Sequence, residues 1–153
     1  MGLEFIDLQA QRACIETEIN EGIKTVLEHG RFVMGPEVAK FEQKLASFGK
    51  AKHALGCANG TDALLLPLMA WGIGPGDAVF CPSFTYCATA EIIAHIGATP
   101  VFVDMDRATC NMDPGSLKKA IEEVKIKGEL TPRAVIAVDL FGQSADYEAI
   151  API

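Results

Sequence analysis

The sequence predicts an α/β fold with a mostly parallel sheet and helices on both faces. Short apolar runs alternate with amphipathic segments of about ten to fifteen residues, as in strands joined by right-handed crossover helices. Half of the residues are hydrophobic and 22% are charged, which is typical of a chain with a packed core. A length of 153 residues allows one domain at most.

Two helices are expected before this alternation, within an N-terminal helical segment at 1–50. Apolar residues at three- and four-residue spacing predict the first helix, from Ile15 to Leu27. A loop with a glycine at each end follows at 30–35. Pro36 suits the first turn of a second helix, which should end near Gly49.

Residues 51–153 are expected to form an incomplete α/β domain. The expected strands and helices, in chain order, are strand 54–57, helix 62–71, strand 78–81, helix 85–96, strand 99–104, helix 114–127 and strand 134–140. Residues 146–153 resemble the start of a further helix. Because no returning strand follows, we expect a piece of a larger domain with an uncovered apolar sheet edge.

The composition argues against several classes of protein. The formal charge is −7, from 13 Lys and Arg against 20 Asp and Glu, so we expect no affinity for nucleic acid. Five cysteines without a C-x-x-C pair disfavour structural zinc and a disulfide framework. The sequence contains no apolar run of about 20 residues, and we expect no association with a membrane. A cytoplasmic protein fits these features.

The first candidate ligand loop joins the strand at 54–57 to the following helix. In open α/β sheets, ligands bind in such loops at the carboxyl ends of strands. Gly60 allows close approach to the backbone, and the amides of Thr61, Asp62 and Ala63 would face an anion at the positive end of the helix. The alternative is an ordinary helix cap by Asn59 or Thr61.

Two further loops could also carry chemistry. Phe84 and Tyr86 would place an aromatic ring where it could stack on a planar ligand, unless both rings pack in the core. Asp104 and Asp106 follow the next strand and could hold a divalent cation, unless they only form a turn. The glycine-rich stretch at 72–77 lacks the spacing of a dinucleotide-binding loop.

Seven segments, spread over nearly the whole chain, resemble the DegT-type sugar aminotransferases in their order and spacing. They are FIDL (5–8), HGRFVMGPEV (29–38), CANGTDAL (57–64), GPGD (74–77), SFTYCATAE (83–91), GATPVFVD (97–104) and FGQSAD (141–146). Members of this family are fold type I enzymes that use pyridoxal phosphate, with pyridoxamine phosphate as its aminated form. Within the family, the residues of these segments are most similar to those of enzymes that aminate the 3-keto group of a UDP-linked N-acetylhexosaminuronic acid.

The resemblance implies roles for particular residues. Gly60, Thr61 and Asp62 would form part of the phosphate cradle, and Tyr86 would stack on the pyridine ring. Asp104 and Asp106 become turn residues. No catalytic residue is expected within this chain, because the family's pyridinium-pairing aspartate and Schiff-base lysine occur in later motifs, which the 153 residues do not include; Asp139 is not that aspartate.

The function expected from this resemblance is transfer of an amino group from glutamate to a UDP-linked keto sugar. The product would serve the synthesis of bacterial surface polysaccharide such as lipopolysaccharide O-antigen, and the whole enzyme would be a homodimer. We expect the isolated chain to be inactive. The alternatives are a metal-dependent nucleotide-sugar glycosyltransferase using Asp104 and Asp106, and a non-catalytic interaction fragment.

Overall fold

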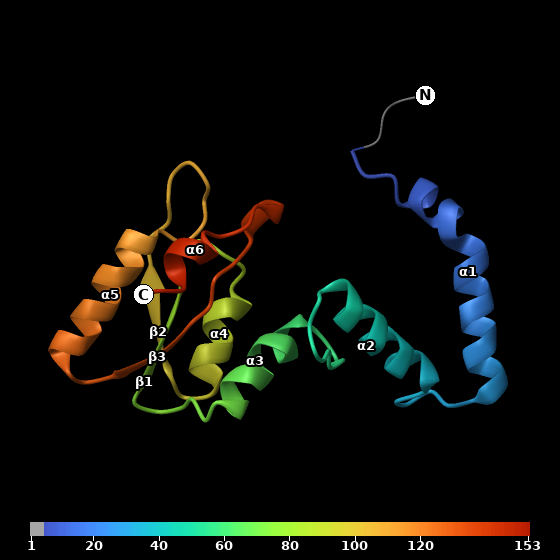
Figure 1. Cartoon of the computed structure of the whole chain (residues 1–153), viewed down its shortest axis with the longest axis horizontal. Coiled ribbons are helices and arrows are strands. Elements are labelled where there is room, and N and C mark those ends of the chain that lie inside the picture. The colour runs from blue at the N-terminus through green and yellow to red at the C-terminus, as the bar shows by residue number, and fades with distance from the viewer. Residues whose placement is uncertain (1–4) are drawn as a thin grey trace. The chain divides into compact units, whose positions relative to one another are not determined.

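The computed structural model describes residues 5–153, which divide into two compact units (Figure 1). The first unit extends to Gly56 and is helical. The second unit, Cys57–Ile153, is the α/β part of the chain. The fold class predicted from the sequence is therefore confirmed.

The sheet of the second unit has three parallel strands in the order β2-β1-β3. They are β1 (Asp77–Pro82), β2 (Thr99–Val103) and β3 (Thr131–Val135). The central strand β1 is almost entirely buried, because it has a neighbour on each edge and helices on each face. One crossover joins β1 to β2 and a second, on the opposite face of the sheet, joins β2 to β3. Because all three strands are parallel, their carboxyl ends lie at the same end of the sheet.

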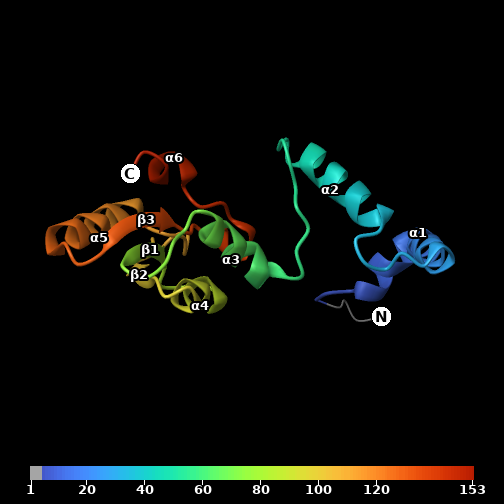
Figure 2. The same ribbon diagram turned by 90° about the horizontal axis from the view of Figure 1, so that it is seen from below.

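Helices cover both faces of this sheet, as expected. α3 (Gly60–Ala70) and α4 (Ala88–His95) pack on one face, and α5 (Pro114–Lys127) packs on the other (Figure 2). The short α6 (Tyr147–Ile150) lies against α5. The alternating side chains of β1 divide the core in two. Val79 and Cys81 join a cluster with Leu68, Ile92 and Ile93, whereas Ala78 and Phe80 join Met112, Leu117 and Ile121.

Two of the expected elements of this unit are corrected by the structure. The expected strand at 134–140 is β3 at 131–135, with one more sheet-like bond from the amide of Ile136 to the carbonyl of Phe80 (2.8 Å). Beyond it the chain turns away through a short 3-10 helix, Leu140–Gly142. The helix expected from Thr85 begins only at Ala88, because residues 83–87 form the loop that leaves β1.

The segment 54–57, expected as a strand, is irregular. A strand needs a neighbour for its backbone groups, and within residues 5–153 none runs beside this segment. The amide of Gly56 donates instead to the carboxylate of Glu42 in the second helix (2.8 Å). The side chain of Leu55 is 89% exposed, so the described residues do not bury it as a sheet would.

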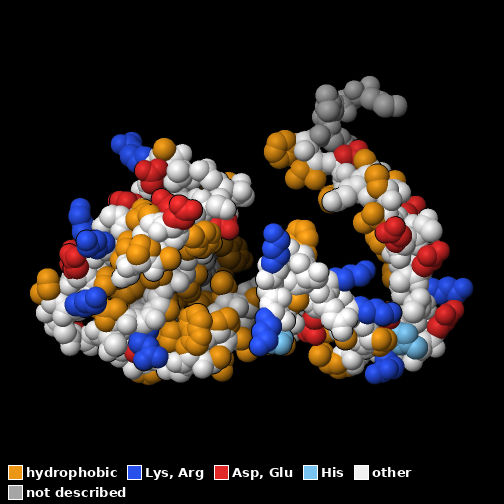
Figure 3. Space-filling view, viewed as in Figure 1, with side chains coloured by type: hydrophobic (Ala, Val, Ile, Leu, Met, Phe, Trp, Pro, Cys, Tyr) orange, Lys and Arg blue, Asp and Glu red, His pale blue; other side chains and the backbone are white. Residues whose placement is uncertain are grey.

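The first unit consists of α1 (Leu8–His29) and α2 (Pro36–Phe48), and both predicted helices are confirmed. α1 starts before the first residue of its apolar pattern because Asp7 caps it, accepting a hydrogen bond from the amide of Ala10 (2.8 Å). No residue of α1 is buried. Apolar side chains therefore remain on the surface of this unit, as they do on parts of the second (Figure 3).

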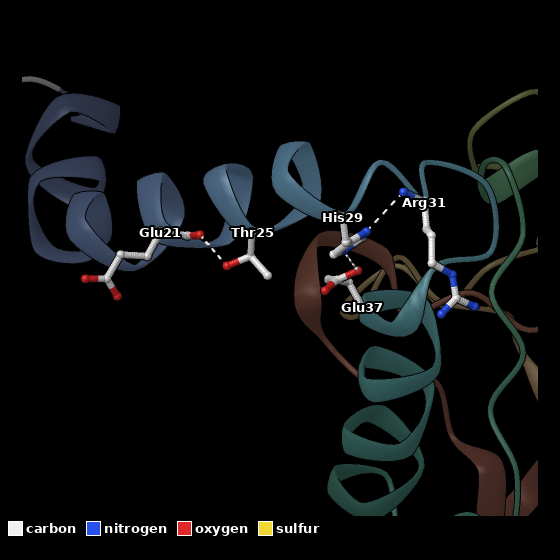
Figure 4. Close-up of polar contacts among 5 residues, drawn as sticks. All are labelled: Glu21, Thr25, His29, Arg31 and Glu37. Carbon is white, nitrogen blue, oxygen red and sulfur yellow. Dashed lines mark hydrogen bonds and ion pairs between the residues drawn. The ribbon is translucent and has the colours of Figure 1, made fainter.

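A polar junction joins the two helices of the first unit (Figure 4). Nδ1 of His29 accepts a hydrogen bond from the amide of Arg31 (3.0 Å), so its Nε2 carries the proton and donates to Glu37 (3.1 Å). Near the end of α1, the hydroxyl of Thr25 donates to the carbonyl of Glu21 (2.8 Å).

Among the helices of the described residues, none is long and apolar enough to cross a membrane.

Candidate functional site

A cavity of about 530 Å³ lies in the second unit, where the start of α3 meets the segments that follow β1 and β3. Ligands of open α/β sheets occupy this kind of position, outside the carboxyl ends of the strands. The wall combines backbone at a helix start, hydroxyl groups, two tyrosine rings and one carboxylate. It is lined by Gly60, Thr61, Leu64, Thr85, Tyr86, Ala88, Thr89, Ile136, Ala137, Val138, Asp139 and Tyr147.

The first wall is the start of α3, which Asn59 caps. Oδ1 of Asn59 accepts from the amide of Asp62 (2.9 Å), and the carbonyl of Asn59 accepts from the amide of Ala63 (3.1 Å). Two of the three amides expected to face an anion are thus engaged within the chain, and this part of the prediction is wrong. The helix-cap alternative is confirmed for Asn59.

The amides of Gly60 and Thr61 precede the first intrahelical bond and find no acceptor among the described residues. They lie at the positive end of α3, where an anion would be stabilised. A Cβ atom built on Gly60 would meet nothing within 4 Å, so the space beside this backbone is open. Asp62 instead supports the loop, because its Oδ2 accepts from the side-chain amide of Asn59 (3.1 Å).

The second wall is the loop after β1. Tyr86 is 76% exposed and lines the cavity, so packing of this ring in the core is excluded. Phe84 packs edge-to-face on Phe141, with ring centroids 6.3 Å apart. The hydroxyls of Thr85 and the buried Thr89 lie 3.4 Å apart on the same wall. An aromatic ring and a helix start are therefore brought to one cavity, as the sequence predicted.

The third wall is formed by residues that follow β3, and the sequence did not predict it. Oδ1 of Asp139 accepts from the amide of Ala145 and from the hydroxyl of Tyr147, both at 2.9 Å. The hydrogen bond to Asp139 raises the pKa of Tyr147, because the carboxylate favours the protonated phenol. No local sequence pattern predicts the hydrogen bond between Tyr147 and Asp139, because the chain between them turns through an irregular loop.

Asp104 and Asp106 lie outside this cavity and serve a turn. The amide of Met105 donates to Asp104 (2.8 Å), and the amides of Ala108 and Thr109 donate to one oxygen of Asp106 (2.9 and 3.0 Å). These backbone hydrogen bonds hold the pKa of Asp106 below its ordinary value. The turn interpretation is confirmed, and residues 5–153 contain no cluster of three or more His, Cys, Asp or Glu placed for a metal.

Comparison with known proteins agrees with this geometry. The DegT/DnrJ/EryC1/StrS aminotransferase family matches residues 13–153. The chain belongs to this family. It is 51% identical, over 97% of its length, to a UDP-2-acetamido-2-deoxy-3-oxo-D-glucuronate aminotransferase from Pseudomonas aeruginosa, of which it covers 39%.

Solved structures of the family share the fold. A DegT/DnrJ/EryC1/StrS aminotransferase from Brucella abortus is 52% identical and superposes with a TM-score of 0.96, over 99% of this chain and 40% of that one. The putative sugar aminotransferase Spr1654 from Streptococcus pneumoniae has been solved in pyridoxal phosphate and pyridoxamine phosphate forms. Its pyridoxamine phosphate form is 33% identical, with a TM-score of 0.81 over 90% of this chain and 33% of that one. Pyridoxal phosphate is therefore the cofactor of the family.

The cavity fits such a cofactor in part. Uncommitted amides beside open space at Gly60 suit a phosphate, and an exposed aromatic ring suits a planar heterocycle. A covalent attachment would require an amine, and no lysine lines the cavity among the described residues. The chain spans about two fifths of the length of the relatives it matches.

Proposed function

We propose that this chain is part of an aminotransferase that moves an amino group from glutamate to a UDP-linked keto sugar, for the synthesis of surface polysaccharide. The observation that carries the proposal is the cavity itself, where a helix start with two uncommitted amides faces the same space as Tyr86. The similarity to the Pseudomonas aeruginosa enzyme supports the UDP-linked 3-keto sugar as substrate.

Within this proposal the residues at the start of α3 and Tyr86 have separate roles in binding the cofactor. The amides of Gly60 and Thr61, with the Thr61 hydroxyl, hold the phosphate of pyridoxal phosphate at the positive end of α3. Asp62 acts on this cradle indirectly, by fastening Asn59. Tyr86 covers one face of the ring. When bound, the cofactor supplies an electron-withdrawing ring that stabilises negative charge on the carbon carrying the amino group.

The proposal also concerns the parts of the protein. Residues 51–153 would be the incomplete cofactor-binding domain, preceded by the helical segment 1–50. The covalent attachment and the partner of the pyridinium nitrogen would lie outside the 153 residues, so the isolated chain would be inactive. We further propose a cytoplasmic homodimer for the whole enzyme.

The test is a reconstituted reaction with the full-length protein. It would be supplied with pyridoxal phosphate, glutamate and UDP-2-acetamido-2-deoxy-3-oxo-D-glucuronate. Formation of 2-oxoglutarate and of the 3-amino sugar is followed by mass spectrometry. The dTDP-linked 3-keto sugars and glutamine serve as comparison substrates. Absence of amino transfer to any nucleotide-linked keto sugar would contradict the proposal, and a preference for a dTDP-linked sugar would contradict only its substrate.

A further inference from the structure

We propose that Asn111 is a positioning residue for the cavity. It would hold loop 139–145 in the conformation that forms the third wall. Asn111 does not line the cavity, and no local motif of the sequence marks it. It is one of two buried polar residues among those the structure describes, with 4% of its surface exposed. A buried amide is costly unless its donors and acceptor are satisfied, so its hydrogen bonds identify its role.

The side chain of Asn111 makes three hydrogen bonds, all to the backbone of one loop. Its Nδ2 donates to the carbonyls of Gln143 (2.9 Å) and Ser144 (3.0 Å). Its Oδ1 accepts from the amide of Leu140 (3.1 Å). One side chain, 29 to 33 residues away in the sequence, therefore fastens both halves of the loop.

The backbone of Asn111 is itself held by the turn that Asp106 forms. The carbonyl of Asn111 accepts from the amide of Asp106 (2.9 Å), and its amide donates to the hydroxyl of Thr109 (3.3 Å). The Asp106 carboxylate orders the same turn through two amides. Asp106 thus acquires a role that needs no metal, because it orders the turn from which Asn111 reaches the loop.

The loop needs outside support because its conformation is strained. Phe141 has a φ of +56°, in the left-handed region that a bulky side chain rarely adopts, and it is 83% exposed. The loop nevertheless contributes one residue to the cavity wall and also contacts the loop after β1. It begins at Asp139, which lines the wall and bonds back to Ala145. Its Phe141 packs on Phe84, two residues before Tyr86.

Loss of the Asn111 amide should therefore loosen the third wall while leaving the sheet intact. Asn111→Asp is the sharpest change, because it keeps the size and the acceptor for Leu140. It replaces the donor by an oxygen that faces two carbonyls. Met112→Ala is the matched control, since Met112 is the next residue and equally buried but packs in the core and makes no side-chain hydrogen bond to the loop. Asn111→Ser is a milder variant if Asn111→Asp does not fold.

The experiment measures amide hydrogen exchange and cofactor affinity in the full-length protein. In Asn111→Asp, we expect the amides of Gln143 and Ala145, which are hydrogen-bonded within the loop, to exchange at least about tenfold faster while those of β1 stay protected. Met112→Ala should show no selective change in the loop. The affinity for pyridoxal phosphate, which bears on this inference through the proposed function, should fall about tenfold in Asn111→Asp and stay unchanged in Met112→Ala.

Unchanged loop exchange in a folded Asn111 variant would overturn the inference. It is also overturned if Met112→Ala loosens the loop equally, or if the loop is loosened while cofactor affinity is unchanged, because Asn111 would then be merely structural. Failure of the wild-type protein to bind pyridoxal phosphate would overturn the proposed function instead. In that case the selective exchange at Gln143 and Ala145 still decides whether Asn111 positions the loop.

Discussion

At the scale of single residues, neighbouring groups in the first cavity wall have different tasks because only some are committed within the chain. The amide of Asp62 is used by Asn59, whereas the amide of Thr61 has no acceptor among the described residues. Asn59 shapes the loop, and the proposed function assigns the Thr61 amide to the phosphate. A substitution can remove the second property without the first.

Thr61→Pro should weaken binding of pyridoxal phosphate by the full-length protein. Proline is tolerated in the first turn of a helix, where its missing N–H has no intrahelical partner, so α3 should form as before. Loss of one hydrogen bond to a charged phosphate costs about 1.5–3 kcal/mol, or about ten- to hundredfold in Kd. Equilibrium titration measures the effect. Thr61→Ala keeps the amide and loses only the hydroxyl, so it should bind the cofactor more tightly than Thr61→Pro does. Wild-type affinity in Thr61→Pro would contradict the phosphate assignment.

Tyr86→Ala should also weaken cofactor binding, by up to about tenfold. A stacked aromatic contact contributes about 0.5–1.5 kcal/mol beyond the burial of area. Tyr86→Phe retains the ring and should bind nearly as the wild type does. The same titration distinguishes the two variants. If both lose affinity equally, the hydroxyl is the important group and the stacking role is wrong.

At the scale of elements, polar side chains rather than apolar patterns mark where several of the helices begin. Asp7 starts α1, Asn59 starts α3, and Asp113 caps α5 by accepting from the amide of Gly115 (2.9 Å). The junction of α1 and α2 follows the same logic, since His29 and Glu37 hold the end of one helix to the start of the next.

The junction of α1 and α2 should lose stability in acid. The pKa of Glu37 is lowered, first by a hydrogen bond from its own backbone and also by His29, so the folded form favours the carboxylate. Its contribution to stability is present above the ordinary glutamate pKa and is lost as the pH falls through the lowered value. Thermal unfolding as a function of pH measures this.

Two variants test the origin of that acid sensitivity. Glu37→Gln should unfold at a lower temperature than the wild type at neutral pH, and the difference should disappear in acid. Glu28→Gln is the control, because Glu28 forms only an exposed pair with Lys24 at 3.7 Å and should change the profile little. A constant difference between Glu37→Gln and the wild type at all pH values would refute the titration of Glu37 as the cause.

At the scale of the whole molecule, two features concern what the described residues leave uncovered or unsupplied: exposed apolar side chains and a cavity without a lysine. α1 buries no residue, and its stripe of Ile15, Ile19, Ile23 and Leu27 remains exposed. The cavity, as the described residues form it, is lined by the start of α3 and by two tyrosines but by no lysine. Under the proposed function, both features would be completed by further parts of the full-length protein.

The isolated chain of 153 residues should neither attach pyridoxal phosphate at one site nor transaminate. No lysine lines its cavity among the described residues, and a covalent attachment would require an amine. Borohydride reduction followed by mass spectrometry should find no stoichiometrically labelled lysine. A single fully labelled lysine together with amino transfer from glutamate would show that the catalytic lysine lies among these residues.

The isolated chain should also self-associate. Exposed apolar side chains as large as Ile, Leu and Phe occur in both units, and contiguous apolar surface of this kind favours association. Light scattering coupled to size-exclusion chromatography should show a mass that rises with concentration. A monomer at all concentrations would contradict this expectation.

The sequence by itself determined the α/β class, most of the helices and the two loops that meet at the cavity. Their signals are local, since the apolar spacing around Leu117, Pro36 at a first turn and Gly60 before a helix each depend on a few neighbouring residues. Only the tertiary structure decided which amides stay uncommitted, that 54–57 forms no strand, and that Asn111 reaches loop 139–145. Strand pairing and buried hydrogen bonds join residues far apart in the chain, and no local pattern encodes them.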